Sequence, residues 1–130
     1  MRAVYVDTSC LVAIAFEEPG WSELAEKLLS YQNLVSSNLL EAELRAAIAR
    51  EGLANPQDEN LLSGVSWILP NRSLASEFRR ILAQGYSKGA DLWHLACALF
   101  LARDPENLPF ATLDERQKQL AENLGFPVVG

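Results

Sequence analysis

The stretch Arg2-Ala3-Val4-Tyr5-Val6-Asp7-Thr8-Ser9 decides the fold that this sequence predicts. A short apolar run stops abruptly at the carboxylate of Asp7, and two hydroxyl residues follow. A continuous apolar run, rather than an alternating one, is typical of a buried strand in a parallel sheet. In an open α/β sheet, ligands bind just beyond the carboxyl ends of the strands. Asp7 is therefore expected to be either the N-cap of the next helix or the first member of a site.

Length and composition predict one globular domain that covers residues 1–130. The chain has 130 residues, of which 49% are hydrophobic and 22% are charged, which is an ordinary soluble profile. No apolar stretch approaches the roughly 20 residues needed to span a bilayer, and the N-terminus does not resemble a signal peptide. We therefore expect a cytoplasmic protein without membrane contact. Cys10 and Cys97 lie in apolar segments and are predicted to be buried free thiols.

The net charge of −6 argues against a broad basic surface for nucleic acid. It does not exclude a nucleic-acid substrate, because a metal site can itself hold phosphate. The charge predicts weak non-specific binding, or a second copy or partner that supplies positive charge.

Apolar periodicity and turn residues predict strands that alternate with helices. Strands are expected at 33–36, at 65–70, within 108–114 and at 126–129. Helices are expected at 8–17, 21–31, 38–51, 73–84, 92–102 and 115–124, with a turn and a weak helix across 53–64 and an exposed loop at 103–107.

Helix 38–51 carries an acid on its apolar face. At about 100° per residue, Glu43 projects between Leu40 and Leu44, whereas Glu41 lies off the apolar stripe and is predicted to be a cap or a solvated acid. Burying a lone carboxylate is costly unless something pairs with it. Glu43 is thus a partly exposed acid at the helix edge, an acid paired with an arginine, or an acid that faces a cation, and we favour the last.

Two more acids lie where helices begin. Asp91 stands at the N-terminal end of helix 92–102, where the helix dipole favours an anion, so a plain N-cap explains it as well as a site does. Asp114 and Gln117 have the spacing of an N-cap and its N3 residue. Because Asp114, like Asp7, comes directly after an apolar strand, the two carboxylates can face the same crevice of a parallel sheet.

Other polar residues are given structural roles. Asn38 and Glu41 have capping-box spacing, with Asn in the Ser/Thr position. His94, the only histidine, is expected to be a packed side chain with one satisfied nitrogen, because nothing in the sequence orients it. Asp104 is expected to be a bystander in an exposed loop.

If Asp7, Glu43, Asp91 and Asp114 converge, the cluster must bind divalent cations or raise its own pKa values by mutual repulsion. Oxygen ligands without Cys or His favour Mg²⁺ or Mn²⁺. Such a site suits phosphoryl chemistry, because the metal would lower the pKa of a bound water and stabilise charge on the phosphate and the leaving oxygen.

Four short motifs together resemble the PIN-domain ribonucleases, especially the VapC-type toxins of toxin–antitoxin pairs. They are Val6-Asp7-Thr8-Ser9, Ser37-Asn38-Leu39-Leu40-Glu41-Ala42-Glu43-Leu44, Asp91-Leu92-Trp93-His94-Leu95-Ala96-Cys97-Ala98 and Thr112-Leu113-Asp114, in that order along essentially the whole chain. The resemblance implies an α/β/α sandwich around a central parallel sheet, and Mg²⁺- or Mn²⁺-dependent endonucleolytic cleavage of RNA.

The resemblance also implies site residues and partners. Asp7, Asp91 and Asp114 would contact the metal or its waters, and Glu43 would complete the cage or position the attacking water as general base. Supporting hydrogen bonds would come from Thr8, Ser9 or Thr112. VapC-like proteins commonly form homodimers and are inhibited by a small antitoxin whose tail blocks the acidic pocket.

Three rival hypotheses follow from the same residues. Asp7 could be the nucleophile of a phosphatase or phosphoacceptor. A haloacid-dehalogenase-like enzyme would need an acid at position 9, which is Ser9, and a receiver-like protein would need adjacent acids at the first strand end. A PIN-like scaffold could be catalytically silent and bind only a partner. A nuclease that acts on DNA flaps would need an extra arch and basic surfaces, which the chain lacks.

Overall fold

A five-stranded parallel sheet forms the centre of the computed structural model, which describes residues 2–52 and 57–130. The strands are β1 (Ala3–Val6), β2 (Asn33–Ser37), β3 (Val65–Ile68), β4 (Phe110–Ala111) and β5 (Val128–Val129). The helices are α1 (Thr8–Ala15), α2 (Trp21–Leu29), α3 (Leu39–Arg50), α4 (Gln57–Ser63), α5 (Ala75–Gln84), α6 (Gly89–Leu101) and α7 (Glu115–Leu124), with a short 3-10 helix η1 (Pro105–Asn107). The predicted α/β fold is confirmed.

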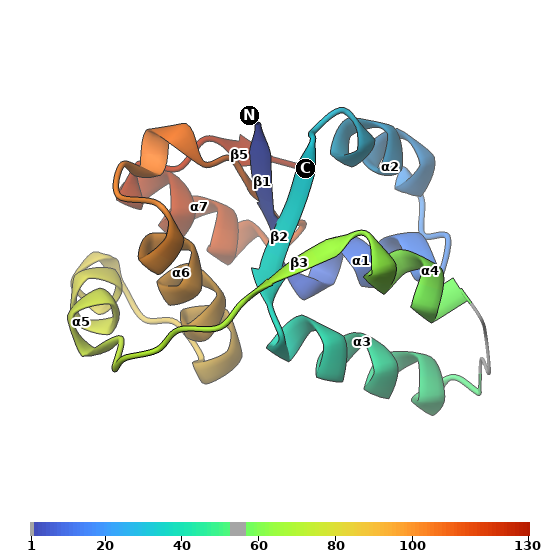
Figure 1. Ribbon diagram of the computed structural model, residues 1–130, viewed down its shortest axis with the longest axis horizontal. Coiled ribbons are helices and arrows are strands. Elements are labelled where there is room, and N and C mark those ends of the chain that lie inside the picture. The colour runs from blue at the N-terminus through green and yellow to red at the C-terminus, as the bar shows by residue number, and fades with distance from the viewer. Residues whose placement is uncertain (1, 53–56) are drawn as a thin grey trace.

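Helices cover both faces of the sheet, with α1 to α4 on one side and α5 to α7 on the other (Figure 1). Side chains alternate between the two faces along a strand. In β1, Val4 and Val6 pack in the core on the α1–α4 side, while Tyr5 packs in the core on the α5–α7 side. Since both faces of β1 are buried, the strand is apolar along most of its length, as its sequence indicated.

The sheet has a switch point between β1 and β4. The strand order is β3-β2-β1-β4-β5, so the chain first builds outward from β1 in one direction and then returns to the other side of β1. Tyr5 and Val6 pair with Phe110 and Ala111. Ligands of open α/β sheets bind at such a switch point, beyond the carboxyl ends of the strands. The next residue after β1 is Asp7.

The helices and strands lie where the sequence predicted them, with shifts of a few residues at their ends. The helix expected over 21–31 ends at Leu29, the one expected from residue 73 begins at Ala75, and the expected loop at 103–107 contains η1. Of the turn and helix expected over 53–64, the helix is α4, and residues 53–56 lie outside the described residues.

The predicted capping box at the start of α3 is wrong. Asn38 has helical backbone angles (φ −69°, ψ −6°) and makes no capping hydrogen bond with its side chain. Instead, the Leu39 N–H donates to Ser37 Oγ at 3.2 Å. Glu41 forms an ion pair with Arg45 at 3.0 Å, one turn along the helix.

Cys10 and Cys97 are buried free thiols, as predicted. Among residues 2–52 and 57–130, every helix is too short or too polar to cross a lipid bilayer.

Two neighbouring leucines of α2 provide a test of the core. Leu28 is 2% exposed and packs on the α1–α4 side, whereas Leu29 is 79% exposed. We expect Leu28→Ala to lower the free energy of unfolding by about 2–5 kcal/mol, because it removes buried methyl groups and leaves a cavity. Leu29→Ala should change it by less than about 0.5 kcal/mol. Urea unfolding followed by circular dichroism measures both, and equal losses would contradict this placement of α2.

Candidate active site

Asp7 lies at the carboxyl end of β1 and caps α1. Its Oδ1 accepts hydrogen bonds from the Ser9 N–H at 3.1 Å and from Ser9 Oγ at 2.5 Å, so the predicted N-cap is confirmed. The side chain is only 4% exposed. Burial raises the pKa of Asp7, and the charge of Asp91 adds to the effect, while hydrogen bonds from Ser9 and Thr112 and the proximity of His94 partly offset it. Asp7 is therefore a buried acid that a nearby positive charge would stabilise.

Hydroxyl groups join the ends of β1 and β4. Ser9 Oγ accepts a hydrogen bond from the Leu113 N–H at 3.0 Å and lies 3.4 Å from Thr112 Oγ1. Thr112 Oγ1 in turn accepts from the Asp114 N–H at 3.1 Å. These bonds fix the position of Asp114 relative to Asp7 across the switch point.

Asp114 caps α7, as its spacing indicated. Its Oδ1 accepts from the Gln117 N–H at 2.9 Å. The Gln117 side chain is 1% exposed, and its Nε2 donates to the backbone carbonyl of Asp91 at 3.0 Å. Gln117 thus connects the start of α7 with the first turn of α6. The sequence indicated only its position in the cap, because its partner is 26 residues away.

Asp91 is not an N-cap. The N-cap of α6 is Lys88, and Asp91 lies in the first turn, because the helix begins earlier than the apolar run that predicted it. Burial raises the pKa of Asp91, and the negative charges of Asp114 and Glu43 raise it further, while His94 and Lys88 oppose the shift. Asp91 also raises the pKa of Asp7. Asp91 is therefore within electrostatic reach of the other three acids of the predicted set.

Glu43 points from α3 toward α6. Its Oε1 accepts a hydrogen bond from Thr8 Oγ1 at 2.6 Å and lies 3.3 Å from His94 Nε2. The hydrogen bond with His94 is the main cause that lowers the pKa of Glu43; the bond from Thr8 also lowers it, against partial burial. Glu43 is thus a partly exposed acid, with a side chain that is 35% exposed, and its partner is a histidine, which the sequence alternatives did not include.

His94 is a packed side chain, as predicted, but it makes more polar contacts than the sequence indicated. Its Nδ1 lies 2.7 Å from Tyr5 Oη, and its Nε2 lies 3.1 Å from Thr8 Oγ1. Both ring nitrogens therefore have partners, and the prediction of one satisfied nitrogen was wrong. The spacing of three residues between Asp91 and His94 places both side chains on the same face of a helix, but it gives no sign of the distant partners of His94.

The donor set is chemically suited to a hard divalent cation. Carboxylate and hydroxyl oxygens are the ligands that Mg²⁺ and Mn²⁺ prefer. Among the described residues, however, no three His, Cys, Asp or Glu side chains lie close enough together to hold one ion. The described side chains thus form no complete protein cage of the kind the sequence suggested. They remain compatible with Mg²⁺, which commonly uses one or two carboxylates, water and substrate phosphate.

Comparison with known proteins agrees with this fold. Residues 4–123 match the PIN domain family, so the chain belongs to that family and the resemblance of its four motifs is confirmed. The chain is also similar over its full length to Ribonuclease VapC46 of Mycobacterium tuberculosis. The two are 30% identical over 135 aligned positions, which cover 99% of this chain and 98% of that protein.

The raised pKa of Asp7 predicts how stability depends on pH. A carboxyl group whose pKa is higher in the folded than in the unfolded protein contributes stability below its unfolded pKa of about 3.9, and that stability is lost as the pH rises through the folded pKa. Asp7→Asn keeps an oxygen that can cap α1 and removes the charge. We expect it to raise the free energy of unfolding near neutral pH by about 0.5–2 kcal/mol, and this gain to shrink as the pH falls toward about 4.

Urea unfolding at a series of pH values, in the presence of chelator, measures the effect. The matched control is Asp104→Asn, which changes an exposed acid and should shift stability by less than about 0.5 kcal/mol. If Asp7→Asn is less stable than the wild type near neutral pH, the Asp7 carboxylate is not under electrostatic strain.

Proposed function

We propose that this protein is a Mg²⁺- or Mn²⁺-dependent endoribonuclease that hydrolyses RNA phosphodiester bonds, and that it is the toxin of a type II toxin–antitoxin pair. One observation carries the proposal: hydrogen bonds through Ser9 and Thr112 hold Asp7 and Asp114 on adjoining strand ends at the sheet's switch point. Membership of the PIN domain family and full-length similarity to a protein named a ribonuclease support it.

The four acids have different environments, which suggest different roles. Asp7 and Asp91 have raised pKa values and would hold the metal ion, with Asp114 acting directly or through water. When bound, such an ion supplies positive charge for the scissile phosphate and lowers the pKa of a coordinated water. Ser9 and Thr112 keep Asp7 and Asp114 in place on adjoining strand ends.

Glu43 is the proposed general base. The pKa of its carboxyl group is lowered, so the group is ionised near neutral pH and can hold a water molecule by accepting its hydrogen, although the same shift makes it a weaker base. Its side chain is 35% exposed, and Thr8 fixes one carboxylate oxygen. In this role Glu43 orients the attacking water and takes its proton, or it completes the ligand set through a water molecule.

The proposed partners are RNA in the cytoplasm, a small antitoxin and a second copy of the chain in a homodimer. The protein has a net charge of −6 and RNA is also negatively charged, so the two repel each other at a distance. This repulsion supports a partner that brings positive charge to the complex. An antitoxin with a basic segment could block the acidic site by pairing with its carboxylates.

Cleavage of RNA by purified protein tests the proposed activity. We expect cleavage of structured RNA in the presence of Mn²⁺, no cleavage after chelation, and at least about a 100-fold loss for Asp7→Asn and for Asp91→Asn, which is the scale on which positioned charged groups act. Gel analysis of end-labelled RNA measures the rates.

The matched control is again Asp104→Asn, which should cleave at the rate of the wild type. Cleavage that survives chelation, or that Asp7→Asn leaves unchanged, would refute the mechanism. A stable phosphorylated protein would favour an aspartate-nucleophile phosphatase instead. Tight binding of a partner protein without turnover would favour a catalytically silent interaction module.

A further inference from the structure

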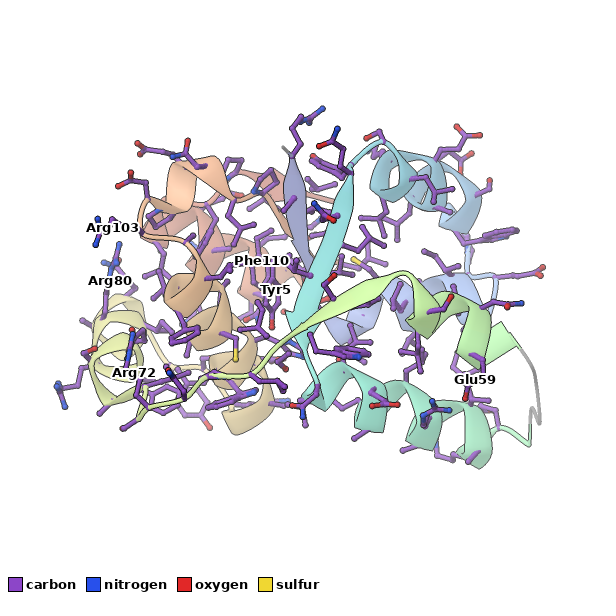
Figure 2. All side chains as sticks on the ribbon, in the orientation of Figure 1. Tyr5, Glu59, Arg72, Arg80, Arg103 and Phe110 are labelled. Atoms are coloured by element: carbon purple, nitrogen blue, oxygen red, sulfur yellow. The ribbon has the colours of Figure 1, made fainter. Side chains whose placement is uncertain are left out.

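A chain of buried polar groups runs from the backbone of β2 to the candidate general base. The Ser37 N–H donates to Tyr5 Oη at 3.2 Å, and Tyr5 Oη lies 2.7 Å from His94 Nδ1. Tyr5 is 0% exposed and His94 is 2% exposed. In Figure 2, Tyr5 lies with Phe110 at the centre of the molecule, between the sheet and α6.

The partners in this chain allow one continuous direction of hydrogen-bond donation. A backbone N–H can only donate, so Tyr5 Oη accepts from Ser37 and keeps its own proton to give. Burial raises the pKa of Tyr5 far above its ordinary value, so the phenol stays protonated. In this direction His94 Nδ1 accepts the phenol hydrogen, and an imidazole that is neutral without metal carries its own hydrogen on Nε2.

The far side of the imidazole faces the site. Nε2 lies 3.1 Å from Thr8 Oγ1 and 3.3 Å from Glu43 Oε1. Thr8 Oγ1 itself donates to Glu43 Oε1 at 2.6 Å. A hydrogen on Nε2 therefore completes a chain of donors that ends at the Glu43 carboxylate. An ionised carboxylate has no hydrogen to donate, so Glu43 is the final acceptor.

Aromatic packing fixes the start of this chain. The Tyr5 ring stacks on Phe110, with centroids 5.0 Å apart and planes 7° apart, and meets the edge of the His94 ring at 5.7 Å and 79°. Tyr5 and Phe110 are paired residues of neighbouring strands. The phenol cannot shift without disturbing β1 and β4.

We propose that Tyr5 and His94 form a positioning relay, in which the tyrosine sets the Nε2–H tautomer of the histidine and the histidine holds the Glu43 carboxylate toward the acidic edge of the sheet. This inference rests on the proposed function for its effect on RNA cleavage. His94 is a positioning residue here, because it acts through Glu43 and Thr8, and the relay transfers no proton.

The tautomer can be measured without any activity, because His94 is the only histidine of the chain. Long-range proton–nitrogen correlation NMR of the uniformly labelled wild type, near neutral pH and without metal, assigns the protonated ring nitrogen. We expect hydrogen on Nε2 and a bare Nδ1. Tyr5→Phe keeps the ring stack and removes the phenol, and it should yield a mixture of both tautomers. Hydrogen on Nδ1, or on both nitrogens, in the wild type overturns the relay.

Steady-state RNA cleavage tests the positioning effect. We expect Tyr5→Phe to lower kcat about tenfold with KM unchanged, which is the lower end of the usual effect of a residue that orients a ligand. His94→Gln retains an N–H donor at similar reach and should keep more activity than His94→Leu, which retains none. The matched control is Tyr86→Phe, which changes a tyrosine that is 75% exposed and should leave kcat unchanged.

The two measurements separate the failures. If Tyr5→Phe has the expected tautomer mixture and an unchanged kcat, or if His94→Gln and His94→Leu lose activity equally, the positioning role is wrong. If the wild type cleaves no RNA in Mn²⁺, the proposed function is wrong, and the NMR result alone decides whether the relay exists.

Discussion

Carboxylates at one edge of the sheet repel one another, and the rest of the site must offset that repulsion for the chain to stay folded. Burial raises the pKa values of Asp7 and Asp91; the charge of Asp91 raises that of Asp7 further, and the charges of Asp114 and Glu43 raise that of Asp91. Gathering such groups lowers the stability of the folded chain unless a cation or a proton is taken up. Three of the four carboxylates accept a hydrogen bond from a neutral donor: Asp7 from Ser9, Glu43 from Thr8, and Asp114 from the Gln117 backbone.

The parallel sheet allows this arrangement through the alternation of its central strand. In β1, Val4 and Val6 anchor one layer of helices, and Tyr5 anchors the other. The two layers bring α3 and α6 to the same edge, where Glu43 from one meets His94 from the other. The β1 strand therefore contributes to both halves of the hydrophobic core and leads directly into the buried acid Asp7, and its Tyr5 contacts the only histidine.

Local patterns predicted the parts of the site that depend on neighbouring residues. Asp7 and Asp114 follow strands and cap helices, and helical periodicity placed Glu43 on an inward face. The capping box at Asn38 failed because that residue already has helical backbone angles. The roles of His94 and Gln117 could not be predicted, because their partners lie 26 to 89 residues away and only the assembled sheet brings them together.

A crystal structure of the protein soaked with Mn²⁺ is the most direct test of the account, because anomalous scattering locates the ion independently of any assay. We expect a peak at the switch point, with carboxylate oxygens of Asp7 and Asp91 roughly 2.0–2.2 Å from the ion, close to the distances of other hard-cation sites. A peak elsewhere on the molecule, or no peak at saturating Mn²⁺ with both carboxylates in their present positions, would contradict it.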